Sequence, residues 1–232
     1  MTPARITVFA GHYGSGKTTL AVNYALRLAR EGRRAALCDM DIVNPYFRTA
    51  DYADLLREGG VELISSPYAN TNVEMPWIPL ESRRVLDDPA LWSVIDLGGD
   101  DSGAMAIGRF AAALREKNAA LWLVVNPCRP LTRDVESLRE VRDAIEAAAG
   151  LRFTGMVGNA NLGQETEMAT VLSSLPLLRE LSRAMDLPII FTAVETSLAE
   201  EAAGALTPED GALFPVTRYQ KAAWSVWEPK KA

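Results

Sequence analysis

The sequence has little of the chemistry that builds disulfide scaffolds or histidine-rich metal sites. It contains two cysteines, Cys38 and Cys128, which lie far apart and form no Cys-x-x-Cys pair, and one histidine, His12. This pattern predicts two reduced thiols, with a metal shared between subunits as the alternative. No charged and apolar leader of the secretory type precedes the first apolar run, so we expect a cytoplasmic protein.

Long apolar runs and an excess of basic residues are also missing. Because no stretch of about 18 apolar residues occurs, no membrane-spanning helix is predicted. Lysine and arginine together number 24, against 30 aspartates and glutamates, which gives a net charge of −6. A basic surface is what releases counterions from nucleic acids, so an acidic chain argues against broad nucleic-acid binding. We therefore expect neither a nucleic acid nor a membrane as a partner.

What the sequence does contain is an alternation of short apolar runs with segments of helical periodicity. Strands are expected over residues 5–10, 35–39, 61–64, 92–97, 119–125, 153–158 and 188–193. Helices are expected over residues 17–31, 48–57, 103–116, 131–148, 165–185 and 196–204, and the tail 213–232 is expected to pack on the domain. Such alternation forms βαβ units with right-handed crossovers. We predict an α/β fold, one domain over residues 1–232, with a three-layer, doubly wound, mostly parallel sheet and helices on both faces.

One glycine-rich segment matches the phosphate-loop pattern G-x-x-x-x-G-K-[ST]. Its residues are Gly11, His12, Tyr13, Gly14, Ser15, Gly16, Lys17 and Thr18. Glycines let the backbone N–H groups wrap a phosphate, and the following helix points its positive end at the same anion. Lys17 is then expected to reach the β- and γ-phosphates, Thr18 to bind Mg²⁺, and Thr19 to lie near the α-phosphate. The segment therefore predicts a nucleotide site between the first strand and the first helix.

Acidic residues follow two of the predicted strands. Asp39 and Asp41 follow the second strand, in Cys38-Asp39-Met40-Asp41, and Asp96 ends the apolar run WSVID, which Leu97, Gly98 and Gly99 follow. Ligands of doubly wound sheets bind at the carboxyl ends of strands. A single aspartate there is usually a helix cap or a turn residue, but next to a phosphate loop it favours a magnesium site. An apolar strand that ends in aspartate is the Walker B arrangement, in which Asp96 would hold Mg²⁺ through water.

Together, the phosphate loop, the Asp-x-Asp pair and the Asp-ended strand resemble the MinD/ParA/CobQ group of P-loop ATPases. The segment 125–134 (VNPCRPLTRD) is similar to that family's Asn-Pro turn after a core strand. The strand that ends in Gly158-Asn159 is similar to the one whose terminal asparagine meets the adenine. The resemblance runs from Arg5 to about Ala203. More narrowly, GHYGSGKT, DIVNPYFRTAD and ANTNVEMP resemble a bacterial subgroup of the family.

The resemblance implies a role for each matched position. Lys17, Thr18 and Thr19 match residues that bind phosphate and Mg²⁺, and Asp41 matches the catalytic acid that positions the attacking water. Asp39 matches its neighbour near the metal, Asp96 matches the acid of the second switch, and Asn159 matches the residue that contacts the base. The implied cofactors are ATP and Mg²⁺.

His12 departs from the family pattern. Many members carry a signature lysine directly after the first glycine of the loop, and it reaches the nucleotide of the partner subunit in a face-to-face dimer. A histidine is mostly neutral at pH 7 and would bind phosphate weakly. Hydrolysis is therefore expected to be slow or to need an activator, and the sequence leaves open whether a nucleotide-dependent homodimer forms.

Several functions fit these features. The favoured one is an ATP-driven switch acting on a client protein that the sequence does not identify, for example in metalloenzyme assembly or positioning of a complex. The alternative is a small-molecule kinase or ligase whose substrate pocket is the irregular loop 65–80, with Asn70, Asn72, Glu74 and Trp77 as contacts. A nucleotide-binding module that hardly hydrolyses its nucleotide is a third.

GTP is disfavoured because residues 159–162 (NANL) are not an Asn-Lys-x-Asp motif. Arg48, Arg109 and Arg129 are candidate phosphate contacts, with a solvated surface role as the default.

Overall fold

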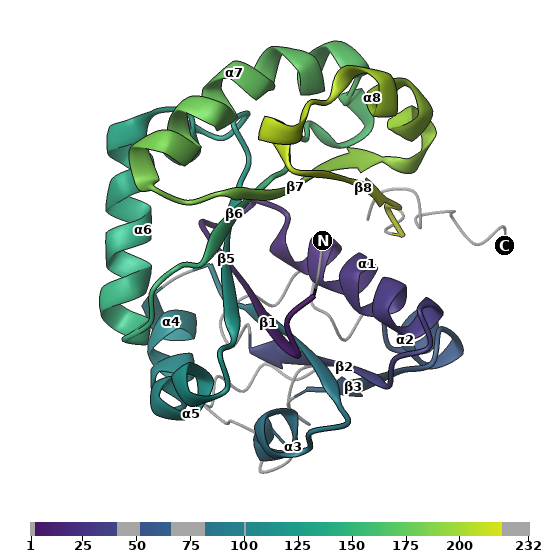
Figure 1. The fold of residues 1–232 in the computed structure, drawn as a ribbon, viewed down its shortest axis with the longest axis vertical. Helices are drawn as coiled ribbons and strands as arrows, with labels where there is room; N and C mark the ends of the chain where they lie inside the picture. The colour runs from purple at the N-terminus through teal and green to yellow at the C-terminus, as the bar shows by residue number, and fades with distance from the viewer. Residues whose placement is uncertain (1–2, 41–51, 66–81, 100, 220–232) are drawn as a thin grey trace, which may run out of the picture.

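The computed structural model describes residues 3–40, 52–65, 82–99 and 101–219, which build one sheet flanked by helices (Figure 1). The sheet has eight strands in the order β3-β2-β4-β1-β5-β6-β7-β8, and every neighbouring pair is parallel. The strands are β1 (Ile6–Ala10), β2 (Ala35–Met40), β3 (Val61–Ile64), β4 (Trp92–Leu97), β5 (Ala120–Val125), β6 (Gly155–Gly158), β7 (Ile189–Glu195) and β8 (Ala212–Val216). The predicted α/β class with a doubly wound, parallel sheet is confirmed.

Helices cover both faces of this sheet. One face carries α1 (Lys17–Arg30) and α2 (Ala53–Glu58), whose apolar residues form one core with the strands. The other face carries α3 (Ser82–Asp87), α4 (Asp101–Gly108), α5 (Ala111–Glu116), α6 (Val135–Ala149) and α7 (Met168–Met185). The last helix, α8 (Ala199–Ala205), packs against α7 and β7. Figure 1 shows α1 and α2 on one side of the strands and α4, α5 and α6 on the other.

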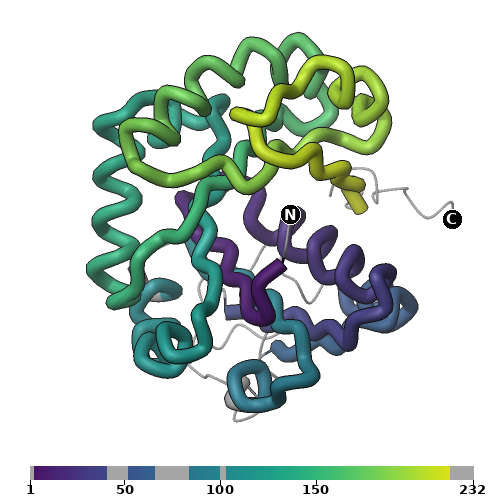
Figure 2. The backbone as a smooth tube through the Cα atoms, viewed as in Figure 1, coloured from purple at the N-terminus to yellow at the C-terminus, as the bar shows by residue number. Residues whose placement is uncertain are grey.

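The sheet grows outward from β1 in two directions. The N-terminal third of the chain builds the β2–β3 side, and the C-terminal third builds the β7–β8 side, as the colours of the backbone tube show (Figure 2). The connection that leaves β1 therefore runs to β2 on one side, and the connection that leaves β5 runs to β6 on the other side. A doubly wound sheet has its ligand crevice where this happens, at the carboxyl ends of the strands.

Most predicted elements are present, and the differences are local. The predicted helix 103–116 is two helices, and α6 begins only at Val135, after the short 3₁₀ turn Pro130–Thr132. The prediction missed α3, as well as β8, which lies in the stretch expected to be a packed tail. The sequence did not indicate this strand because it contains Pro215. Proline has no N–H to donate, so it is tolerated mainly in edge strands, where that position needs no partner. Among the strands that the structure describes, β8 lies at the edge of the sheet and pairs with β7 alone.

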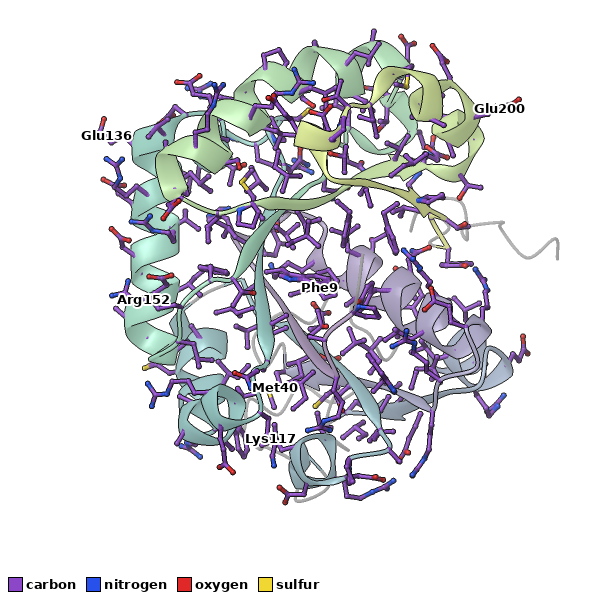
Figure 3. All side chains as sticks on the ribbon, in the orientation of Figure 1. Phe9, Met40, Lys117, Glu136, Arg152 and Glu200 are labelled. Carbon is purple, nitrogen blue, oxygen red and sulfur yellow. The ribbon has the colours of Figure 1, made fainter. Side chains whose placement is uncertain are left out.

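An aromatic cluster fixes α1 on the sheet. The rings of Phe9, Tyr24 and Trp122 meet pairwise edge to face, with centroids 5.2 to 5.6 Å apart. Phe191 and Phe214 extend the cluster toward β8. Figure 3 shows Phe9 in the interior, whereas Glu136, Arg152 and Glu200 lie on the outside of the molecule. Because Tyr24 belongs to α1, this packing holds the helix, and the loop before it, in place against β1.

Candidate nucleotide-binding site

The phosphate loop connects β1 to α1 at the centre of the sheet, where β4 and β5 flank β1. Gly11 has a φ of 151°, and a β-carbon there would lie 2.6 Å from the carbonyl oxygen of Val124. Gly16 has a φ of 93°, and a β-carbon there would lie 2.3 Å from Nδ2 of Asn159. Both positions therefore require glycine, for backbone conformation and for space. The loop closes with a 3.2 Å hydrogen bond from the N–H of Ser15 to the carbonyl of His12.

The start of α1 presents backbone donors to this loop. Gly16 precedes the helix and provides no side-chain cap, and the first turn contains no acidic residue. The first N–H groups of a helix have no partner within the helix and carry partial positive charge. Ser15 is 1% exposed, and its buried hydroxyl has no hydrogen-bond partner among the described residues. This end of α1 is therefore suited to an anion.

Lys17 is the first residue of α1, and its side chain turns back over the loop. It is 7% exposed, and its Nζ atom donates to the carbonyl of His12 at 3.2 Å. A β-carbon on Gly99 would lie 2.9 Å from that Nζ and 2.8 Å from the backbone nitrogen of Tyr13. The ammonium group thus lies between the phosphate loop and the chain that leaves β4.

Two of the predicted magnesium residues are neighbours across the sheet. Asp39 on β2 and Asp96 on β4 are register partners. Both are buried, at 9% and 1% exposed. Adjacent residues Cys38 and Ile95 belong to the core on the opposite face. Because side chains alternate along a strand, both carboxylates lie on the face covered by α1. Thr18 lies in the first turn of that helix and is half-buried.

These groups fit Mg²⁺, because carboxylate and hydroxyl oxygens are the hard ligands that this ion prefers. Among the residues that the structure describes, no group of three or more His, Cys, Asp or Glu side chains could hold a metal ion. A metal here would therefore need oxygens from Thr18, from phosphate and from water, which is the usual way in which proteins bind Mg²⁺.

Asn159 follows β6 and lies behind the loop. Its side chain is 5% exposed and donates from Nδ2 to the carbonyl of Ser15 at 2.7 Å. The predicted contact of Asn159 with the base stays a prediction, while its contact with the loop backbone was not predicted. His12 is bound locally, since its Nδ1 lies 2.9 Å from the carbonyl oxygen of Tyr13. Tyr13 itself is 58% exposed.

Asn126, at the end of β5, supports the loops beside the candidate site, and these contacts were not predicted. It is 1% exposed, and its Oδ1 accepts hydrogen bonds from the N–H of Cys128 at 3.0 Å and of Asn161 at 3.3 Å. Its Nδ2 donates to the carbonyl of Asn161 at 3.0 Å. Asn126 therefore joins the loop after β5 to the loop after β6. The Asn-Pro pair in the sequence was the available signal for this turn.

The remaining predicted residues separate into three groups. Arg129 contacts the phosphate loop, with its Nε 3.3 Å from the carbonyl oxygen of Gly14. Arg109 lies exposed between α4 and α5. Asp41, Arg48 and all of the loop 65–80 except Ser65 lie outside the described residues. The helices that the structure describes include none long and apolar enough to cross a membrane.

Comparisons with known proteins support a nucleotide-binding domain. The model of the CobQ/CobB/MinD/ParA nucleotide binding domain matches residues 6–161, more than half of the chain. A comparison with curated protein sequences gave no match. FtsY from Mycoplasma mycoides is similar in structure, with a TM-score of 0.55 and 16% identity over 83% of this chain and 60% of that one. The signal recognition particle 54 kDa protein from Aeropyrum pernix K1, solved with GDP, has a TM-score of 0.54 and 18% identity.

The second match covers 83% of this chain and 41% of the other. The chain thus spans less than two thirds of either protein. At these identities the likeness shows a shared P-loop α/β fold.

Proposed function

Because the chain belongs to the CobQ/CobB/MinD/ParA family of nucleotide-binding domains, we propose that it is a Mg²⁺-dependent ATPase that acts as a nucleotide-driven switch on a partner protein. The family membership carries nucleotide binding in general. The preference for ATP, the need for Mg²⁺, hydrolysis and the switch are the specific parts of the proposal.

Binding would use groups that the fold already holds in place. The backbone N–H groups of the loop and of the first turn of α1 would bind the β-phosphate, and Lys17 would bind the β- and γ-phosphates. Asp39, Asp96 and Thr18 are the residues that would hold Mg²⁺, which supplies charge stabilisation when it is bound. The absence of an Asn-Lys-x-Asp motif after β6 favours adenine over guanine.

The position of Gly99 is the observation that carries the switch. A β-carbon on Gly99 would be within 3 Å of both Tyr13 N and Lys17 Nζ, so the chain after β4 lies directly on the phosphate loop. Gly103 in α4 is packed against Gly98 in the same way, with a β-carbon 2.8 Å from Gly98 Cα. A terminal phosphate bound by Lys17 would therefore contact or displace the chain after β4, and α4 would move with it. Nucleotide switches work through such segments, which respond to the γ-phosphate.

Hydrolysis needs positioning and charge stabilisation rather than covalent chemistry. We assign the orientation of the attacking water to Asp41, which is the next residue after the end of β2. Lys17 would stabilise the charge that develops on the transferred phosphate. The client protein is not identified. In this proposal it would bind differently to the two positions of the chain after β4, with and without a bound terminal phosphate.

The test is a comparison of nucleotides on the full chain. We expect binding and turnover of ATP with Mg²⁺, weaker binding of GTP, and loss of binding in Lys17→Ala. Lys117→Ala is the matched control, because Lys117 follows α5 before the amino end of β5, away from the phosphate loop. Equal or tighter binding of GTP would overturn the preference for ATP. Turnover that requires an added metabolite would replace the switch with a small-molecule kinase or ligase.

A further inference from the structure

Arg129 lies against the phosphate loop, although it is 115 residues away from Gly14 in the sequence. Its Nε donates a hydrogen bond to the carbonyl oxygen of Gly14 at 3.3 Å. A β-carbon built on Gly14 would lie 3.6 Å from Nε and 3.8 Å from Cζ of Arg129. The guanidinium group therefore covers the middle of the loop, whose backbone is built to wrap phosphate.

The backbone of Arg129 is fixed by the turn after β5. The N–H of Arg129 donates to the carbonyl of Asn126 at 2.9 Å, and the N–H of Thr132 donates to the carbonyl of Arg129 at 3.1 Å. Asn126 and Thr132 are fully buried, and the hydroxyl of Thr132 also donates to the carbonyl of Asn126. Pro130 follows directly and starts the 3₁₀ turn. Only the side chain of Arg129 would have to be ordered by a ligand, which lowers the entropic cost of binding.

The charge of Arg129 is not neutralised by a described carboxylate. The ion pairs of the described residues do not include Arg129. Its bond to Gly14 uses Nε–H alone, so the four N–H donors on Nη1 and Nη2 remain. Residues 11–19 contain one lysine, Lys17, and no arginine, whereas a nucleoside triphosphate carries several negative charges. The phosphates of a nucleotide are therefore the anion that a second cation on this loop would bind.

We propose that Arg129 binds the phosphates of the nucleotide held by the same chain, as a second cation in addition to Lys17. A guanidinium suits this role because its planar fork can bind two phosphate oxygens at once. The charge on the phosphates would then be balanced within one subunit, without a basic residue from a second copy. This inference rests on the proposed nucleotide binding.

The first experiment measures the affinity of Arg129→Gln for ATP with Mg²⁺. Glutamine keeps an N–H donor for the carbonyl of Gly14 but has no charge, so a loss of affinity reports the charge rather than the loop contact. We expect binding about tenfold to a hundredfold weaker, with partial rescue by Arg129→Lys. Arg139→Gln, at an exposed position of α6, is the matched control and should bind as the wild type does.

The outcomes separate this inference from the proposed function. If the wild type binds no ATP, the proposed function fails and the inference fails with it. If the wild type binds ATP and Arg129→Gln binds it equally well, only the inference is wrong. If Arg129→Gln and Arg139→Gln are weakened alike, the effect is one of general surface charge, and the inference is again wrong.

A mixing experiment tests whether Arg129 acts within its own chain. Arg129→Gln has an intact Lys17, and Lys17→Ala has an intact Arg129, so a mixed dimer could rebuild one site only if Arg129 reached across to its partner. We expect an equimolar mixture to show no tight-binding component for ATP. A tight component that appears on mixing would overturn binding within one chain and assign Arg129 to the nucleotide of a partner copy.

Discussion

Gly99 lies so close to Lys17 that a β-carbon on Gly99 would be 2.9 Å from the ammonium nitrogen. The same β-carbon would be 2.8 Å from Tyr13 N and 2.9 Å from Tyr13 Cα. The ammonium could move away, since it ends a flexible side chain, but the backbone of the loop could not. The chain after β4 and the phosphate loop are therefore coupled directly, through a contact that only glycine permits.

Gly99→Ala should break this coupling. The added methyl group would push the chain after β4 away from Tyr13, because the clash is with backbone atoms. We expect ATP turnover to fall by about tenfold or more, while the far-ultraviolet circular dichroism spectrum stays that of the wild type. Steady-state kinetics with ATP and Mg²⁺ measure the effect.

The matched control for this substitution is Gly204→Ala. Gly204 lies in α8, and a β-carbon there would meet no atom within 4 Å. Alanine is also the better helix former by about 1 kcal/mol, so this variant should be as stable as the wild type or slightly more so, with unchanged turnover. Wild-type turnover in Gly99→Ala would show that the contact has no part in the reaction.

Asn126→Ala should destabilise the fold and loosen the site. The substitution leaves the partly buried N–H groups of Cys128 and Asn161 without their acceptor, and it removes the buried side chain that joins the two loops. We expect the free energy of unfolding to fall by about 3 kcal/mol, as measured by urea denaturation. Gln164→Ala, at an exposed position of the turn after β6, should change it by less than about 0.5 kcal/mol.

Sequence reasoning could propose the parts of the candidate site that local patterns indicate, but not the contacts that depend on long-range packing. The phosphate loop and the acids near the strand ends can be seen in the sequence. The resemblance to a known family then gave each of them an expected role. That Asp39 and Asp96 are register partners depends on β4 being inserted between β2 and β1. The contact of Arg129 with Gly14 likewise requires β5 to lie next to β1. The spacing of residues along the sequence does not predict either of these strand neighbours.

The acid dependence of stability should depend on Asp210. This carboxylate is fully buried and bonded to Arg179 through both oxygens, at 2.7 and 2.8 Å. Burial alone would raise the pKa of Asp210, but hydrogen bonds from Arg179 and Thr207 outweigh it and hold the pKa below its usual value. A carboxyl whose pKa is lowered by folding stabilises the fold above its unfolded pKa of about 3.9. That stability is lost as the pH falls through the lower, folded pKa.

Asp210→Asn should therefore lower stability at pH 7 and flatten its decline below about pH 4. Urea denaturation at a series of pH values measures both effects. Asp143→Asn is the control, because Asp143 pairs with Arg142 on the surface with 55% of its side chain exposed, and exposed pairs contribute little. A decline of the same steepness in Asp210→Asn and in the wild type would show that Asp210 is not responsible.

Asp41→Ala should reveal whether ATP drives dimerisation. If Asp41 positions the attacking water, its loss blocks hydrolysis and holds the protein in its ATP-bound state. We expect the solution mass of this variant, measured by light scattering, to double with ATP and Mg²⁺ and to stay that of a monomer without nucleotide. Lys17→Ala, which should bind ATP weakly, controls for effects of the added nucleotide and should keep the lower mass. A variant that binds ATP without any change in mass would show that the switch acts within one subunit, through the chain after β4 and α4.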